Sequence, residues 1–163
     1  MAFYRVKQFF WSITARLAIE DKIFIEKHLN SKELILFSRL SVFEQKHSIK
    51  VAKNIQKIYY KNKEYCDTMI KVALLHDIGK ITCRVNPIEK SILVILDHIS
   101  KGRLEKFSSF KKVNVYYNHG EIGYNILQKY NYDEKFLYLI KNHHKDIKDN
   151  YELKILQECD DKN

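Results

Sequence analysis

Residues 73–81 read ALLHDIGKI and place polar side chains directly after an apolar run. A helix end that continues a buried pattern and then carries His76, Asp77 and Lys80 is costly unless the buried polar groups find partners. Imidazole and carboxylate groups are common ligands of divalent metals. Gly79 allows a sharp turn after the pair. The stretch therefore predicts a metal site at a helix end, and the rest of the chain has to supply further ligands.

The remainder of the sequence has the pattern of an all-α protein. Four glycines and one proline in 163 residues leave few turn signals, whereas apolar residues recur at intervals of three and four. We expect a compact helical bundle with the metal site in its core. The predicted helices span 20–29, 32–40, 44–62, 64–78, 87–100, 116–130, 133–145 and 150–160, and residues 100–114 are expected to form an irregular basic loop.

Length and composition indicate one domain, residues 1–163, with 45% hydrophobic and 30% charged residues. Residues 1–40 are expected to form a helical extension that packs on a metal-binding core at 44–160. The extension begins with an amphipathic helix, for which docking on a partner or a membrane surface is the alternative. The apolar stripe of that helix comprises Phe3, Val6, Phe10, Ile13 and Leu17.

Composition also bears on the cellular location of the protein and on its binding partners. There is no transmembrane run and no signal-peptide pattern, so we expect a cytoplasmic protein. The spacing of Cys66, Cys83 and Cys159 fits neither a disulfide framework nor a zinc knuckle, which indicates reduced thiols. A net charge of +9 favours phosphorylated partners such as nucleotides. No RNA-binding motif is evident, so nothing argues strongly for nucleic acid. The sequence is compatible with a homo-oligomer as well as with a monomer.

Several of the seven histidines fall on apolar helix faces or beside glycine. His47 shares a helical face with Val51 and Ile55, so its imidazole points toward the core. His119 precedes Gly120, and Gly123 follows one turn later. A glycine inside a helix costs about 1 kcal/mol relative to alanine, which indicates a close backbone approach there.

Two further segments carry candidate ligands. His143 and His144 follow an apolar run in tandem. Asp160 lies on the helical face of Leu153 and Leu156, which makes it a better inward carboxylate than its neighbour Asp161. His28 and His98 have no other candidate ligands near them in the sequence and are expected to be structural or exposed. Glu44 and Glu121 are candidates for orienting imidazoles, with an ordinary surface position as the alternative.

The complete set of candidate metal ligands exceeds one tetrahedral site. Five histidines and two aspartates are enough for two ions, with Asp77 as the natural bridge. A donor set without thiolates favours Fe or Mn, with Zn, Co and Ni as alternatives. The candidate ligands are His47, His76, Asp77, His119, His143, His144 and Asp160.

The order His47, then His76 and Asp77, then Asp160 resembles the HD superfamily of metal-dependent phosphohydrolases, whose signature is H, HD, D over a helical domain. HDIGK matches the HDIG variant of that signature. HGEIG and HHKD resemble the HPEIG and HHE segments of the two-metal HD-GYP branch, although the Gly-Tyr-Pro motif is absent. Stand-alone HD nucleotide hydrolases are the alternative relatives. The resemblance implies one metal on His47, His76, Asp77 and Asp160, and a second on Asp77, His119 and His143 with His144.

The resemblance also implies an activity, namely hydrolysis of a phosphate ester in a nucleotide or dinucleotide by a metal-activated hydroxide. The expected catalytic residues are Asp77, Lys80 and His144, with His144 protonating the leaving oxygen where it is not a ligand. Lys80, Arg103 and His119 are the expected substrate contacts. A helix-terminal cation is the alternative for Lys80. A di-iron oxygenase of the same superfamily and a catalytically silent metal-dependent binding module are the rival functions.

Overall fold

The computed structural model describes residues 17–59 and 63–162, and within these ranges every regular element is a helix. The all-α prediction is confirmed. The N-terminal amphipathic helix falls on residues 1–16, outside the described residues. The elements are α2 (Ile19–His28), α3 (Ser31–Phe37), α4 (Val42–Tyr59), α5 (Lys63–Leu75), η1 (Ile78–Thr82), α6 (Pro87–Ser100), η2 (Arg103–Phe107), α7 (Lys111–Leu127), η3 (Gln128–Tyr130), α8 (Glu134–Asn142) and α9 (Tyr151–Asp161).

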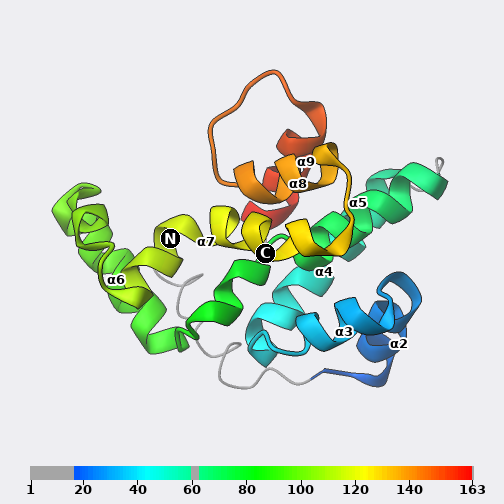
Figure 1. Cartoon of the computed structure of the whole chain (residues 1–163), viewed down its shortest axis with the longest axis horizontal. Helices are drawn as coiled ribbons and strands as arrows, with labels where there is room; N and C mark the ends of the chain where they lie inside the picture. The colour runs from blue at the N-terminus through cyan, green and yellow to red at the C-terminus, as the bar shows by residue number, and fades with distance from the viewer. Residues whose placement is uncertain (1–16, 60–62, 163) are drawn as a thin grey trace.

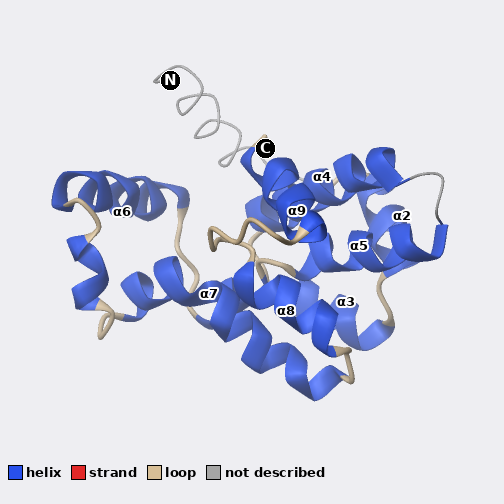
Figure 2. Ribbon diagram, turned by 90° about the horizontal axis from the view of Figure 1, so that it is seen from above, coloured by secondary structure: helices blue, strands red, loops and turns tan. Residues whose placement is uncertain are grey.

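The hydrophobic core is centred on α4 and α5, which pack along each other with α8 and α9 beside them (Figure 1). Val51 and Ile55 from α4 and Ile70 from α5 are fully buried. The short helices α2 and α3 contribute to the same core, for example through Phe37. Figures 1 and 2 both show α6 lying away from α2–α5 at one end of the molecule. None of the described helices combines the length and apolarity needed to cross a membrane.

The turn η1 packs directly on α7. A Cβ atom at Gly79 would lie 2.0 Å from the carbonyl oxygen of His119 and 2.8 Å from the amide nitrogen of Gly123. Because both neighbours are backbone atoms, only glycine fits at position 79. The close approach expected at Gly123 is thus made by η1, and it sets the segment after Asp77 against the helix that carries His119.

Some predicted boundaries were wrong. The helix predicted over 64–78 ends at Leu75, and the one predicted over 133–145 ends at Asn142. The segment 100–114 is not an irregular loop, because it contains η2 and the first turn of α7. After α6, Lys101 and Gly102 adopt left-handed backbone conformations, with φ of 52° and 78°, which reverses the chain before η2. The first turn of α7 is anchored by buried Val113.

Helix α9 is tied to α5 and α8 by one carboxylate. Glu152 Oε1 accepts hydrogen bonds from the Tyr65 hydroxyl at 2.5 Å and from Lys135 Nζ at 2.6 Å. Lys135, followed by Tyr65, lowers the pKa of Glu152 from 4.5 to about 2. This contact helps to hold the helix that carries Asp160.

The pKa of Glu152 gives a pH-dependent prediction. A carboxylate whose folded-state pKa is depressed stabilises the fold above its unfolded pKa, and this contribution is lost as the pH falls through the folded value. The difference in unfolding free energy between the wild type and Glu152→Gln should therefore be constant near neutral pH and shrink below about pH 4.3. Denaturant titrations at several pH values test this, with Glu26→Gln on the exposed side of α2 as control. A difference that does not change with pH would contradict the assignment.

Candidate metal centre

The pair His76 and Asp77 lies in the turn between α5 and η1, and both side chains are buried, at 0% and 1% exposure. Consecutive residues inside a helix point about 100° apart and do not serve one site. Here the helix has already ended at Leu75, so the backbone turn brings both side chains to the same place. The 3₁₀ turn therefore explains how the sequence uses an adjacent histidine and aspartate together.

The other candidate ligands converge on this turn from four helices. Two groups of donor atoms form, and within each group the atoms lie within 4.8 Å of one another. The first group has its members on α4, the α5–η1 turn and α9, and the second on the same turn, α7 and the end of α8. The first group is His47, His76 and Asp160, and the second is Asp77, His119, His143 and His144.

Asp77 stands between the two groups. Its Oδ1 lies 3.3 Å from His119 Nε2 and 3.9 Å from His143 Nε2. Its Oδ2 lies 3.6 Å from His76 Nε2 and 2.6 Å from Lys80 Nζ. One carboxylate oxygen therefore faces each group, as a bridging carboxylate would require.

Asp160 joins the histidines of the first group. Its Oδ1 lies 2.6 Å from His47 Nε2 and 3.5 Å from His76 Nε2. Asp161 is exposed, so the structure brings the aspartate favoured by the sequence pattern, and not its neighbour, into contact with the histidines.

Main-chain carbonyl groups orient three of the imidazoles. Nδ1 of His76 donates to the Ala73 carbonyl oxygen at 2.7 Å, Nδ1 of His119 to that of Val115 at 3.0 Å, and Nδ1 of His143 to that of Ile140 at 2.6 Å. A carbonyl oxygen can only accept, so each Nδ1 carries the proton and each Nε2 keeps a lone pair in the neutral ring. All three Nε2 atoms therefore face the centre as potential ligands.

The two glutamates considered for orienting imidazoles have other partners. Glu44 accepts from the Ser41 hydroxyl at 2.8 Å at the start of α4, and Glu121 lies 2.9 Å from Lys141 Nζ. The acceptors are instead carbonyl groups three or four residues before each histidine, which the sequence did not predict. His76 and His143 lie just beyond a helix end and His119 lies in the middle of α7, so each follows a turn of helix whose carbonyl groups point toward it.

Unsatisfied polar atoms show that these residues fit a cation. Among residues 17–59 and 63–162, His76 Nε2 and Asp77 Oδ1 are buried without a hydrogen-bond partner. Nε2 of His119 also lies 3.2 Å from Nε2 of His143 and 2.9 Å from Nε2 of His144. His119 and His143 both donate through Nδ1 to carbonyl oxygens, so their neutral rings place lone pair against lone pair at the 3.2 Å contact. A divalent cation would satisfy these atoms together, because imidazole nitrogen and carboxylate oxygen are its normal ligands.

The electrostatics of the second group favour the protonation states that bind metal. Burial, followed by repulsion from His76, His144 and His119, holds the pKa of His143 well below its usual range. Burial lowers the pKa of His144 to about 4. Burial alone would raise the pKa of Asp77, but Lys80 and His76 outweigh it and hold that pKa well below its usual range. Neutral imidazoles and an ionised carboxylate are the forms that coordinate metals.

The carboxylates of the first group and its neighbour favour positive charge at His76. Burial opposes the charged form of His76, but Asp77 and Asp160 outweigh it and raise its pKa. Positive charge is thus favoured at the position of His76 Nε2, between the two carboxylates, and a bound divalent cation would supply it there.

Two lysines lie beside the centre. Lys80 Nζ lies 2.6 Å from Oδ2 of Asp77. Lys90, from the first turn of α6, was missed. Its Nζ lies 5.7 Å from the centroid of the Phe43 ring, one turn before His47 on α4, and repulsion from Lys80 lowers its pKa. Only the fold brings α6 to this position, so sequence spacing gave no signal.

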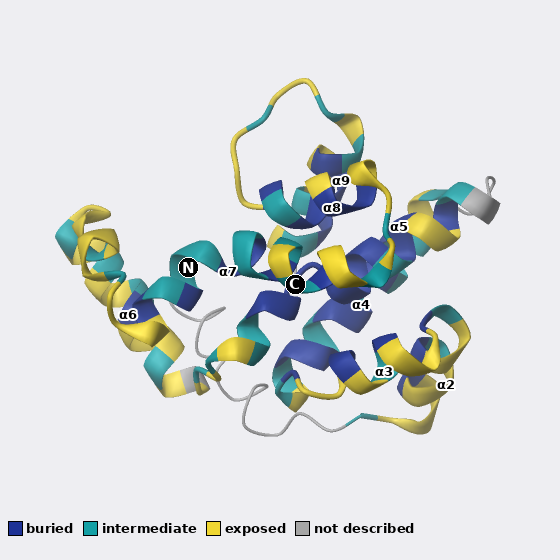
Figure 3. Ribbon diagram, in the orientation of Figure 1, coloured by how far each residue is buried: buried dark blue, intermediate teal, exposed yellow. Residues whose placement is uncertain are grey.

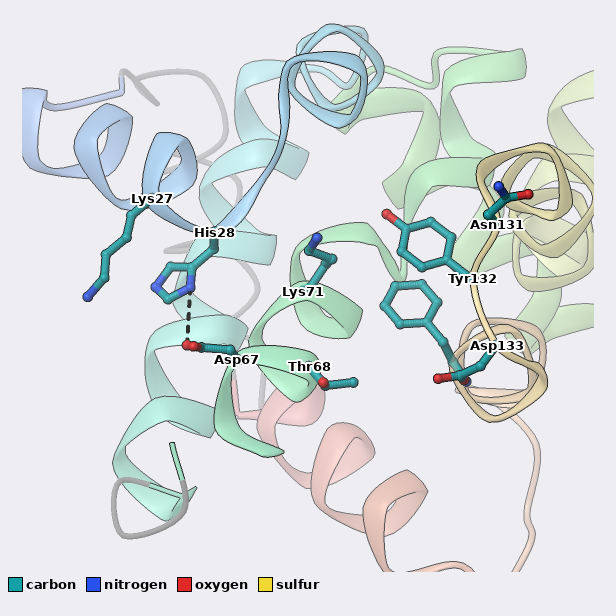
Figure 4. A pocket seen from close by; sticks show the side chains of 9 residues that line it. Lys27, His28, Asp67, Thr68, Lys71, Asn131, Tyr132 and Asp133 are labelled. Atoms are coloured by element: carbon teal, nitrogen blue, oxygen red, sulfur yellow. Dashed lines mark hydrogen bonds and ion pairs between the residues drawn. The ribbon is translucent and has the colours of Figure 1, made fainter. Parts of the chain in front are cut away.

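Arg103 belongs to neither group. It is exposed in η2, which packs on α6 and α7. A separate cavity of about 420 Å³ also lies away from the candidate ligands, none of which lines it. Figure 4 shows it between His28, Asp67 and Lys71 on one side and Asn131, Tyr132 and Asp133 on the other. His28 Nδ1 lies 3.6 Å from Asp67 there, whereas His98 is exposed on α6.

The fold and the centre together define an all-helical protein with a buried histidine–aspartate cluster able to hold a divalent metal. A family model described as HD domain matches residues 45–162, and the chain belongs to this family. The HD superfamily consists mostly of metal-dependent phosphohydrolases. Comparison with curated proteins gives no match, and neither does comparison with solved structures.

Proposed function

We propose that this protein is a metal-dependent phosphoric ester hydrolase that acts on a nucleotide or dinucleotide. The observation that supports it best is the position of Asp77, which faces histidines through one oxygen and the Lys80 ammonium through the other. Negative charge accumulates on the oxygens of a phosphoryl group during its transfer, so a site for it needs fixed positive charge. A carboxylate that contacts both candidate metal ligands and a lysine ammonium would bring a metal ion and a fixed cation to the same place.

We assign the metal-binding core to residues 44–160 of a single domain, and residues 1–40 to an extension. The family match over residues 45–162 supports this division, as does the packing of α2 and α3 on the core. The two groups of ligands would hold two ions, with Fe or Mn favoured. When bound, divalent ions would supply a nucleophile at neutral pH and positive charge near the phosphoryl oxygens.

The protein's own residues would bind and orient the ester. Lys80 would contact a phosphoryl oxygen as a point charge, and Lys90 would add a second cation at the same mouth. Asp77 would fix the position of the Lys80 ammonium. With a pKa of about 4, His144 is neutral at pH 7, which favours a role as ligand or proton acceptor over the role of acid. Nε2 of His119 points into the second group, so we assign His119 as a metal ligand and not as a substrate contact.

Lys80→Ala should separate binding of metal from turnover. Removing one fixed electrostatic contact to the transition state lowers kcat by about 10²–10³-fold in comparable sites. We expect Lys80→Ala to keep the metal content of the wild type and to lose hydrolysis of bis(p-nitrophenyl) phosphate to about that extent. Elemental analysis and initial rates measure the two quantities.

Lys22→Ala, at an exposed position on α2, is the matched control and should retain both metal and rate. A wild-type rate in Lys80→Ala would refute the catalytic role of this lysine. Loss of metal in the same variant would show instead that Lys80 supports the ligands.

The histidine-rich donor set favours one alternative, an iron-dependent oxygenase of the same superfamily, because imidazoles suit iron as well as other divalent metals. Protein purified without oxygen or chelator distinguishes the functions. Iron retained with dioxygen consumption and no ester hydrolysis would favour the oxygenase. Metal that only raises the unfolding temperature would favour a binding module.

A further inference from the structure

Lys90 lies in the first turn of α6, and the start of this helix is fixed by its own sequence. Asn86 caps the helix by accepting from the Glu89 amide at 2.9 Å, and the Glu89 carboxylate accepts from the Asn86 amide at 3.1 Å. Pro87 occupies the first helical position. These are strong start signals, so Lys90 extends from a well-defined turn.

The start of α6 is also tied to its surroundings on two sides. Just before the helix, Arg84 Nη2 donates to the carbonyl oxygen of Arg39, in the segment between α3 and α4, at 3.0 Å. Within the first turn, Glu89 Oε1 accepts from Lys112 Nζ on α7 at 2.6 Å. These contacts fix the place from which the side chain of Lys90 extends.

The side chain of Lys90 reaches toward the first group of ligands. Its Nζ lies 5.7 Å from the centroid of the Phe43 ring. Phe43 and His47 are four residues apart on α4, and residues at this spacing are neighbours on one face of a helix. The ribbon of α6 is largely exposed in Figure 3, and Lys90 itself is exposed. Its ammonium group is therefore accessible to a ligand that approaches the metal centre from solvent.

The charge of Lys90 has no carboxylate partner. Within residues 17–59 and 63–162, no ion pair forms at its Nζ. Two acids close by are engaged elsewhere, because Glu89 pairs with the lysine of α7 and Glu44 accepts from a serine hydroxyl at the start of its own helix. Repulsion from Lys80 lowers the pKa of Lys90, which agrees with two ammonium groups facing the same space. An anion between them would relieve this repulsion.

We propose that Lys90 selects the substrate by its charge, so that a nucleotide with two or more linked phosphates is favoured over one with a single ionised phosphate. The phosphoryl group that reacts would contact Lys80, and a further phosphate of the same molecule would contact Lys90. This inference rests on the proposed function, because it names the class of phosphoric ester that the same site would take.

The different surroundings of the two lysines favour a substrate with more than one phosphate. Lys80 shares its charge with Asp77 at 2.6 Å, whereas Lys90 has no such partner. A ligand with one phosphate at Lys80 would leave the charge of Lys90 uncompensated, and a second ionised phosphate would offset it. Lysine binds phosphate as a point charge on a flexible stem, so Lys90 can follow a phosphate next to the reacting one.

Calorimetric titration with two inert anions tests this selection without any need for turnover. Methylphosphonate carries one phosphonate group, and methylenediphosphonate carries a pair joined by a methylene group that water does not cleave. In the presence of Mn²⁺ we expect the wild type to bind methylenediphosphonate more tightly. Lys90→Met should reduce the ratio of the two dissociation constants by about 10-fold. Methionine keeps an apolar stem over Phe43 and removes only the charge.

Lys106→Met is the matched control. It removes the same charge from an exposed position of η2, which packs on α6, and should keep the wild-type ratio. An unchanged ratio in Lys90→Met would overturn the proposal. An equal loss in Lys106→Met would also overturn it, because the effect would then come from the overall charge of the protein.

The selection by Lys90 and the proposed function can fail separately. Hydrolysis of bis(p-nitrophenyl) phosphate by a protein whose ratio does not depend on Lys90 would reject the selection and leave the proposed function in place. A ratio that depends on Lys90, in a protein that hydrolyses no phosphoric ester, would reject the proposed function and keep Lys90 as the contact for a second phosphate.

Discussion

Gly79→Ala is expected to be among the most disruptive single-methyl changes in this protein. The added Cβ would lie 2.0 Å from the His119 carbonyl oxygen, and the nearest atoms belong to the backbone, which cannot rotate away. Overpacking of this kind costs about 3 kcal/mol or more, a large share of the roughly 5–15 kcal/mol that stabilises a typical domain. Because η1 and α7 would have to separate, metal content should fall together with stability. Denaturant unfolding and elemental analysis measure the two effects.

Gly102→Ala is the matched control. Position 102 has a positive φ of 78° but nothing within 4 Å of the added atom, so only backbone strain is introduced. That strain costs about 1–2 kcal/mol, and metal content should not change. The steric argument fails if Gly79→Ala destabilises the protein no more than Gly102→Ala does.

Asp77→Ala should empty the metal centre. Its two oxygens face different groups of ligands, so in the proposed two-ion centre removing the side chain would take a ligand from each ion and leave Lys80 without its closest partner. We expect metal to fall from about two ions per chain to almost none, with loss of measurable ester hydrolysis. Elemental analysis of protein prepared without chelator gives the result directly.

Asp161→Ala provides the comparison, because this aspartate is exposed beside Asp160 on the same helix and should keep the full metal content. Asp160→Ala should lose only the ion of the first group. Retention of metal by Asp77→Ala would contradict the bridging assignment, and a single ion in the wild type would reduce the centre to one group.

The helical pattern and the motif around His76 predicted the fold class and the set of residues that gather. Periodicity reports which face of a helix is buried, and each apolar stripe that carried His47 or Asp160 did point inward. Periodicity does not report where a helix stops. The end of α5 at Leu75 depends on how η1 packs on α7, which is a contact between segments distant in sequence.

The same limit explains why Lys90 was missed. Lys90 approaches the centre because α6 contacts α7 and the lysine side chain reaches over Phe43 at the start of α4. Arg103 is exposed in η2 outside both groups of ligands, and its role as a substrate contact stays a prediction. Functional residues that depend on the arrangement of helices are therefore recovered from the structure and not from spacing.

The anchoring of the imidazoles has a consequence for how such a protein can diverge. His76, His119 and His143 are held by carbonyl oxygens of their own local backbone, and every amino acid carries that acceptor. Replacing the side chain at Ala73 or Val115 leaves the anchor in place as long as the helix persists. The orientation of these three imidazoles thus tolerates sequence drift at the acceptor positions, in contrast to position 79, where the packing of η1 on α7 admits only glycine.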